Sequence, residues 1–152
     1  MKKLNITKER FEKSRYFNKK YGKLEYVSES GKLFKTNKGQ VLKFQDEDFE
    51  INESGVLVDY KGKGGDVVIP EGVTIIGEFS FEDANLTNVT IPKSVTSIEE
   101  NAFAYNENLT NLVIPGNVTS IGNGAFHGCS SLTSVTIGNG VKSIGRCAWS
   151  WC

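Results

Sequence analysis

The sequence predicts a mostly β solenoid of about four stacked coils, preceded by a small α+β module. Three observations support this fold class. The last two thirds of the chain repeat one pattern every 22 to 23 residues, the same apolar positions recur in each copy, and the charge of the chain is divided between its two parts. A fixed period of this length is typical of proteins whose coils stack into one continuous core.

The clearest copies of the repeat begin at Leu86, Leu109 and Leu132. Apolar positions recur within them at intervals of 23 residues, and the equivalent sets are Val95, Val118 and Val141, then Ile98, Ile121 and Ile144, then Phe103, Phe126 and Trp149. One copy cannot enclose a core alone, so we expect each side chain to lie directly over its equivalent in the next coil. An earlier copy is one residue shorter between Phe81 and Leu86.

Each copy is expected to contain two extended segments. The first, Leu-x-x-Val-x-Ile, has the alternating apolar positions of a half-buried strand, and equivalent strands would pair in parallel. A proline follows Ile91 and Ile114 and ends this strand, because proline has no N–H for the ladder. The second segment, Val-Thr-Ser-Ile, is followed by a tight turn that directs the Ala–aromatic pair inward.

The pattern Leu-Thr-x-Val-x-Ile-Pro-x-x-Val-Thr-x-Ile-Gly-x-x-Ala-Phe-x-x-Cys, over roughly residues 55–152, resembles the BspA-like class of leucine-rich repeats. This resemblance implies a right-handed leucine-rich repeat solenoid and a non-catalytic role in protein–protein interaction or cell adhesion, as in many bacterial surface proteins. The chain departs from the pattern at Ser80, Glu99, Asn106 and Gly138. These departures concern local turns.

Charge divides the chain into two parts. There are 18 basic and 18 acidic residues in all, but residues 1–45 contain 13 basic and 4 acidic ones, so this part carries +9 and the remainder −9. Such an asymmetry indicates two modules or a basic arm. The basic N-terminus lacks the apolar stretch of a secretory signal, and no segment is long enough to span a bilayer. The sequence therefore favours a cytoplasmic protein, whereas the family resemblance favours the cell surface.

Residues 1–45 are expected to form a basic helix and a β-meander. Thr7 is a suitable N-cap and Gly22 a suitable stop for a helix over residues 7–21. Three strands are predicted at residues 23–27, 32–36 and 40–44, separated by turns rich in Gly and Asn. Residues 46–62 are predicted to form a hairpin that caps the first coil of an array over residues 63–152.

The outward positions of the first strand in each coil form the candidate contact surface. They are Asp66, Val68, Asn88, Thr90, Asn111, Val113, Ser134 and Thr136. This strip is small and nearly neutral, and it lacks the aromatic and Arg side chains that dominate binding hot spots. We therefore expect weak or multivalent contact with an unidentified partner protein.

The last coil has no following copy in this sequence. It leaves six apolar side chains uncovered: Leu132, Ile137, Val141, Ile144, Trp149 and Trp151. Exposure of large apolar side chains costs about 1.5 to 3 kcal/mol each, so this end is predicted to pair with the same end of a second chain in a homodimer. A truncated sequence is the alternative.

The residues predict no enzyme, no cofactor and no metal site. His127 is the only histidine and is interpreted as a surface residue, because no motif places a nucleophile beside it. His127, Cys129, Cys147 and Cys152 lack the spacing of a zinc site. Cys129 and Cys152 are 23 residues apart and are expected to be neighbouring free thiols, as suits a reducing compartment, with a disulfide as the alternative.

The basic segment supports a second functional hypothesis, which is binding of nucleic acid or another polyanion. The candidate residues are Lys8, Arg10, Lys13, Arg15, Lys19 and Lys20. Aromatic residues lie between these cations, as they do in proteins that stack bases. No nucleic-acid-binding motif accompanies the charge, so the sequence favours a basic face that docks against the acidic array of its own or a partner chain.

Overall fold

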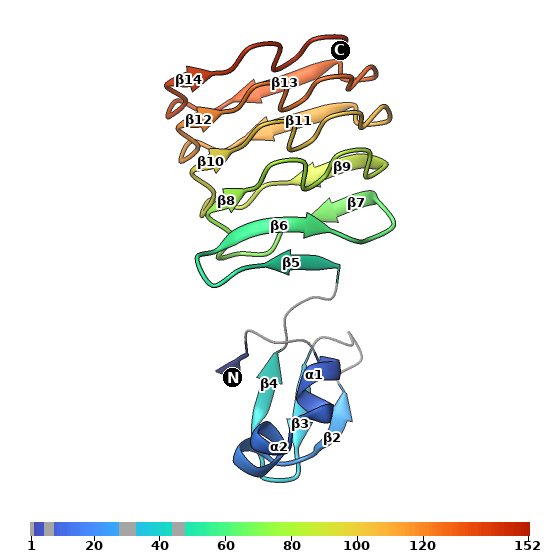
Figure 1. Ribbon diagram of the computed structural model, residues 1–152, viewed down its shortest axis with the longest axis vertical. Helices are drawn as coiled ribbons and strands as arrows, with labels where there is room; N and C mark the ends of the chain where they lie inside the picture. Colours follow the sequence, from blue (N-terminus) through green and yellow to red (C-terminus); the bar gives the residue numbers. More distant parts are fainter. Residues whose placement is uncertain (1, 5–7, 28–32, 44–47) are drawn as a thin grey trace. The chain divides into compact units, whose positions relative to one another are not determined.

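The computed structural model describes residues 2–4, 8–27, 33–43 and 48–152 (Figure 1). The chain divides into two compact units, Met1–Glu47 and Asp48–Cys152, and each is described by itself. The expected N-cap Thr7 lies outside the described residues.

Unit 1 contains two short helices and a small sheet. Its elements are β1 (Lys2–Lys3), α1 (Lys8–Lys13), α2 (Arg15–Tyr21), β2 (Leu24–Val27), β3 (Phe34–Thr36) and β4 (Val41–Lys43). The strand order is β1-β4-β3-β2, with an antiparallel meander of β2, β3 and β4 and with β1 parallel to β4. The buried core consists of Leu4, Phe11, Tyr21, Phe34 and Leu42.

The prediction of one helix over residues 7–21 is wrong, because the helix is broken at Ser14. The backbone of Ser14 is extended (φ −95°, ψ 116°), and its hydroxyl accepts a hydrogen bond from the N–H of Phe17 as the N-cap of α2. Asn18 Nδ2 donates to the carbonyls of Phe11 and Ser14 (3.0 and 2.7 Å). These bonds satisfy backbone groups at the junction and favour two short helices over one.

Unit 2 begins with a hairpin and continues as stacked coils. The hairpin consists of β5 (Phe49–Ile51) and β6 (Val56–Tyr60), and Asn52 Oδ1 accepts from the N–H groups of Ser54 and Val56 in its turn. Each coil then contributes one front strand and one short back strand. The front strands are β7 (Gly65–Val68), β9 (Leu86–Thr90), β11 (Asn111–Ile114) and β13 (Ser134–Ile137). The back strands are β8 (Ile75–Ile76), β10 (Ser97–Ile98), β12 (Ser120–Ile121) and β14 (Ser143–Ile144).

The back strands form one sheet with the hairpin, in the order β14-β12-β10-β8-β6-β5, and Figure 1 shows the coils stacked along it. Ile98 pairs in register with Ile121, and Ile121 pairs with Ile144. Four aromatic rings stack through the core. The distances between ring centroids are 5.0 Å from Phe81 to Phe103, 5.2 Å from Phe103 to Phe126 and 5.6 Å from Phe126 to Trp149. The predicted leucine-rich repeat solenoid with a small α+β module is confirmed.

Asn106 compensates for the residue that is missing from the short coil. Its Oδ1 accepts from Leu86 N–H (3.0 Å), and its Nδ2 donates to the carbonyls of Phe81 and Phe103 (2.9 and 2.8 Å). The side chain therefore bridges Phe81 and Leu86, the two ends of the shortened segment. Because Asn106 is fully buried, these backbone groups have no access to water, and their hydrogen bonds fix the turn.

Candidate functional site

The eight predicted contact residues lie together on one exposed surface, which we name the front face. Asp66 is paired with Asn88 and Val68 with Thr90, while on the other two front strands Asn111 is paired with Ser134 and Val113 with Thr136. All eight side chains are exposed. The strand alternation predicted from the sequence therefore places them correctly, and their role in contact stays a prediction.

The sequence gives no sign that the front ladder is interrupted in its middle. Strands β7 and β9 pair, and so do β11 and β13, but β9 and β11 are not hydrogen-bonded neighbours. The back strands β10 and β12 of the same two coils remain paired. Pro115 contributes to the break because it has no N–H, whereas Gly138 at the same place in the next coil donates to Ile114 (2.8 Å). Pro92 lacks the same donor where β7 and β9 still pair, so the missing bond weakens the ladder without opening it alone.

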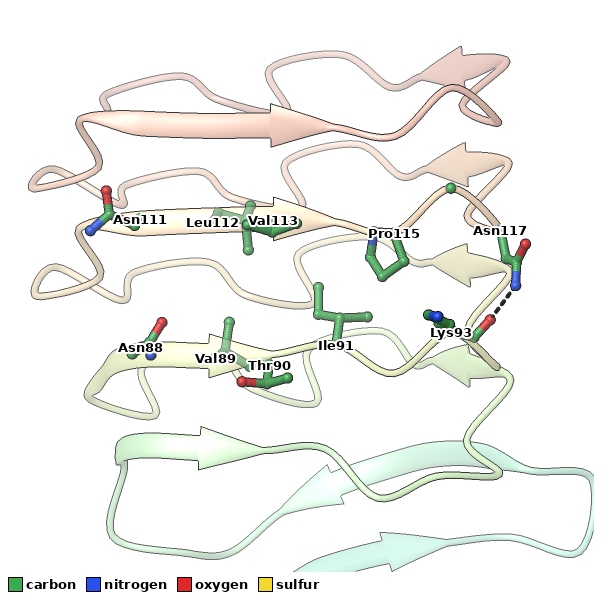
Figure 2. A pocket seen from close by; sticks show the side chains of 11 residues that line it. Asn88, Val89, Thr90, Ile91, Lys93, Asn111, Leu112, Val113, Pro115 and Asn117 are labelled. Carbon is green, nitrogen blue, oxygen red and sulfur yellow. Dashed lines mark hydrogen bonds between the residues drawn. The ribbon is translucent and has the colours of Figure 1, made fainter.

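A depression of about 580 Å³ lies at this break (Figure 2). Figure 2 shows Asn88 and Asn111 at one end and Lys93 and Asn117 at the other. Buried apolar side chains, among them Leu112, line the surface between them. Amide groups around an apolar floor can hydrogen-bond the backbone of an extended polypeptide.

Six residues were predicted to form a self-association surface on the last coil. Leu132, Val141 and Trp149 are half-buried, and Ile137 and Ile144 are exposed by 42% and 48%. Strands β13 and β14 of this coil are the last strands of their sheets. Trp151 is exposed by 78%, and its ring contacts His127 in the turn segment of the preceding coil (5.2 Å between centroids).

The cysteines are free thiols in the structure, and two of them bond to the coil below. Cys129 Sγ donates to the Phe103 carbonyl (3.3 Å), and Cys152 Sγ donates to the Phe126 carbonyl (3.1 Å). Burial raises the pKa of Cys129 to about 11 and raises the pKa of Cys152 as well. Cys147 lies exposed in the turn, away from this position. Among the described residues, no group of three or more His, Cys, Asp or Glu side chains converges as a metal site would require.

His127 has a neighbour that the sequence analysis missed, because Ser150 lies one coil later at the equivalent position. Ser150 Oγ is hydrogen-bonded to His127 Nδ1 and also donates its single proton to the Cys147 carbonyl (3.1 Å). The contact with Ser150 orients the imidazole ring of His127.

Two exposed aromatic residues of the array were also missed. Phe79 and Tyr105 are exposed by 49% and 42%, in the turn segments that connect a back strand to the next front strand. Both have left-handed backbones, with φ of 57° and 60°. The sequence could have shown them, because each is an aromatic residue that stands outside the recurring apolar positions of the repeat.

The predicted polyanion-binding residues whose side chains the structure describes have different neighbours. Lys8 contacts Glu12 (3.2 Å), and Lys20 lies over the rings of Tyr16 and Tyr21 (5.8 and 5.4 Å to the centroids). A hydrogen bond with Tyr16 raises the pKa of Lys20. The side chain of Arg10 lies outside the described residues.

A second depression, of about 530 Å³, lies on unit 1. Two of the six candidates, Lys13 and Arg15, line it together with Lys23, Asn18 and Glu12. No side chain that lines this depression would select a phosphate over another anion. The negative charge of the Glu12 carboxylate repels any anion. Binding of nucleic acid therefore stays a prediction.

Comparison with protein families decides the identity of the array. Residues 61–152 match the model described as BspA type leucine rich repeat region (6 copies), which covers well over half of the chain. The chain belongs to this family. A comparison with curated proteins finds no match. Within the described residues of this BspA-type repeat protein, no helix is long and apolar enough to cross a membrane.

Three solved structures have a similar fold, and two of them are described as leucine-rich repeat proteins. The leucine-rich repeat protein of T. pallidum is 26% identical, with a TM-score of 0.60 over 70% of this chain and 65% of that chain. A leucine-rich repeat protein from Eubacterium ventriosum is 24% identical, with a TM-score of 0.51 over 63% of this chain and 29% of that chain. The pneumococcal vaccine antigen PcpA is 18% identical, with a TM-score of 0.50 over 74% of this chain and 35% of that chain. The BspA-type repeat protein thus spans between 29% and 65% of these relatives.

Proposed function

We propose that this chain is a non-catalytic interaction module that binds a partner protein through its front face. The observation that carries the proposal is the set of eight exposed side chains held in register on paired strands, with the depression between β9 and β11 at its centre. Family membership supports a repeat-based role in interaction or adhesion. The depression offers hydrogen-bonding amides and an apolar floor, which suit an extended segment of a partner.

The front face lacks large aromatic anchors, so one module binds weakly. Display of several copies on one support converts weak contacts into strong attachment, with gains of about 100- to 10,000-fold in apparent affinity. This behaviour suits adhesion, where many copies act together.

A peptide-display experiment tests the front face. Random 12-residue peptides are selected against the full chain, and the selected peptides are titrated against a Thr90→Arg/Val113→Arg variant, whose new side chains flank the depression. We expect at least a tenfold loss of affinity, because two long cations obstruct an otherwise small surface. Both positions are exposed, so the fold should tolerate the change within about 0.5 kcal/mol per site.

The matched control is Val58→Arg, because Val58 is an exposed strand residue (44%) outside the front face. Its affinity for the same peptides should equal that of the unmodified chain. Selected peptides that bind the double variant as tightly as the unmodified chain would exclude the front face as the contact surface.

A further inference from the structure

Every exposed aromatic residue of the array, residues 61–152, has a left-handed backbone. Phe79, Tyr105 and Trp151 are exposed by 49%, 42% and 78%, and their φ angles are 57°, 60° and 61°. A left-handed conformation is unfavourable for a bulky residue, and exposure of a large ring to water is unfavourable as well. Glycine occupies the equivalent positions in another coil, as Gly124 and Gly128. The left-handed conformation belongs to the turn of every coil, since Asp83, Asn101 and Cys147 share it, so the fold does not need a ring at these positions.

Two of these rings form one surface with His127, which we name the aromatic ridge (Tyr105, His127 and Trp151). The centroid distances are 5.3 Å from Tyr105 to His127 and 5.2 Å from His127 to Trp151. Tyr105 lies over Gly128, where an added Cβ would be 2.7 Å from its Cδ1. Backbone bonds between coils hold these positions, because Tyr105 N–H donates to His127 (2.7 Å) and Gly128 N–H donates to Ser150 (2.9 Å). The ridge spans three coils and is fixed in place before any partner binds.

The charge beside the Tyr105 end of the ridge is negative, whereas the turn segments of the next two coils, 122–131 and 145–152, contain Arg146 and no acidic residue. Asp83 lies one coil before Tyr105 at the equivalent position, and its N–H donates to Ala104 (2.9 Å). The turn segments 77–85 and 99–108 contain no basic residue, and their acidic residues are Glu78, Glu82, Asp83, Glu99, Glu100 and Glu107. None of these carboxylates forms an ion pair with another described residue of the chain. A positively charged group placed over Tyr105 would therefore meet both an aromatic face and unpaired carboxylates.

We propose that the aromatic ridge, together with Asp83, is a docking surface for a segment of a partner protein that presents Lys or Arg side chains. The cationic head lies over the Tyr105 ring beside the Asp83 carboxylate, and its aliphatic stem packs along the ridge. Unit 1 of this chain contains lysines over aromatic rings in the same way, with Lys8 5.4 Å from Phe34 and Lys2 5.6 Å from Tyr21. This surface is separate from the front face and adds a second contact to the proposed interaction module.

The backbone permits an unusually clean test. Tyr105→Gly and Trp151→Gly remove the rings and place glycine at left-handed positions, as Gly128 already does, so neither change should lower the melting temperature. The full chain is titrated with a 12-residue peptide of alternating Lys, Arg and Gly at low salt. We expect the unmodified chain to bind it, each glycine variant to bind about three- to tenfold more weakly, and Asp83→Asn to weaken binding similarly.

Two controls separate this surface from the front face and from non-specific attraction. The uncharged variant Thr90→Gln/Val113→Gln alters the front face without adding positive charge, so it should bind the cationic peptide like the unmodified chain. A peptide with norleucine in place of every Lys and Arg should not bind. Equal affinity of the Tyr105→Gly/Trp151→Gly double variant and the unmodified chain would overturn the proposal, as would no binding of the cationic peptide by the unmodified chain. Tight binding of the norleucine peptide would overturn the cationic partner in favour of an apolar one.

Discussion

At the scale of single residues, one buried position shows how different side chains serve the same backbone group. Asn106, Cys129 and Cys152 each donate to the carbonyl of the aromatic core residue in the coil below, at 2.9, 3.3 and 3.1 Å. A thiol is a weak donor, so two coils use a weaker version of the bond that the amide makes. Cys129 is as completely buried as Asn106, whereas Cys152, in the last coil, is exposed.

The burial of Cys129 predicts a loss of stability in alkali. Its pKa is raised from 9.0 to about 11 in the folded chain, so between these pH values the unfolded thiol ionises while the folded thiol keeps its proton. The free energy of unfolding should therefore fall as pH rises from about 9 to about 11, by up to about 1.4 kcal/mol per pH unit from this group.

Urea unfolding of the chain and of Cys129→Ala at pH 8, 9, 10 and 11 measures this effect. The alanine variant lacks the titrating thiol, so the stability difference between the two proteins should shrink as pH rises. A difference that stays constant from pH 8 to pH 11 would show that Cys129 ionises alike in both states.

At the scale of the elements, the Asn106 bridge predicts a large effect from a small change. Asn106→Ala leaves the Leu86 N–H without its bond in a buried turn, and it removes one of two bonds from the carbonyls of Phe81 and Phe103. Those carbonyls keep the bonds from Ala84 N–H (3.2 Å) and Cys129 Sγ (3.3 Å). The free energy of unfolding should fall by about 1 to 3 kcal/mol, which is the cost of one buried polar group left unpaired. Asn106→Cys should cost about 1 kcal/mol less than alanine, because a thiol can still bond to Phe81 as Cys129 bonds to Phe103.

Circular dichroism during urea unfolding measures both variants. Asn108→Ala is the matched control, because Asn108 is exposed and its side chain bonds only to Asn85 (3.0 Å). The control should change stability by less than about 0.5 kcal/mol. An Asn106→Ala variant as stable as this control would mean that water or a shifted backbone replaces the bridge.

The same elements show what the sequence could and could not predict. A period of 23 residues fixes which side chains stack, so the columns through Ile121 and Phe126, the front strands and the eight outward residues followed directly. The break at Ser14 depends on a competition between local hydrogen bonds and helix continuation, and the sequence analysis judged it wrongly. The break between β9 and β11 was not predicted, because Pro115 removes one donor there but Pro92 does the same where β7 and β9 still pair. The aromatic ridge was missed because a repeat alignment highlights positions that agree, and Tyr105 and Trp151 stand where Gly128 also stands.

At the scale of the whole array, each coil is stable only because its neighbours cover it. Burial along the isoleucine column shows this, with Ile76, Ile98 and Ile121 exposed by 0%, 1% and 2% and Ile144 by 48%. A solenoid of this kind gains stability from the interfaces between coils, so the cost of a substitution depends on which coil carries it. The last coil has apolar groups on one side that contact no other coil of this chain.

The exposed surface of the last coil predicts self-association of the 152-residue chain. Two copies of this surface can cover each other about a twofold axis. Because Ile137 and Ile144 are about half exposed, their removal from water contributes roughly 0.7 to 1.5 kcal/mol for each side chain. Light scattering across micromolar concentrations should give a mass rising towards twice 16.7 kDa. Ile144→Lys should return it to the mass of one chain, because the dimer would bury an unpaired charge. Val68→Lys, at an exposed valine (65%) on the front face, should leave association unchanged. A mass of one chain for the unmodified protein throughout this range would contradict the prediction and leave the last coil exposed in solution.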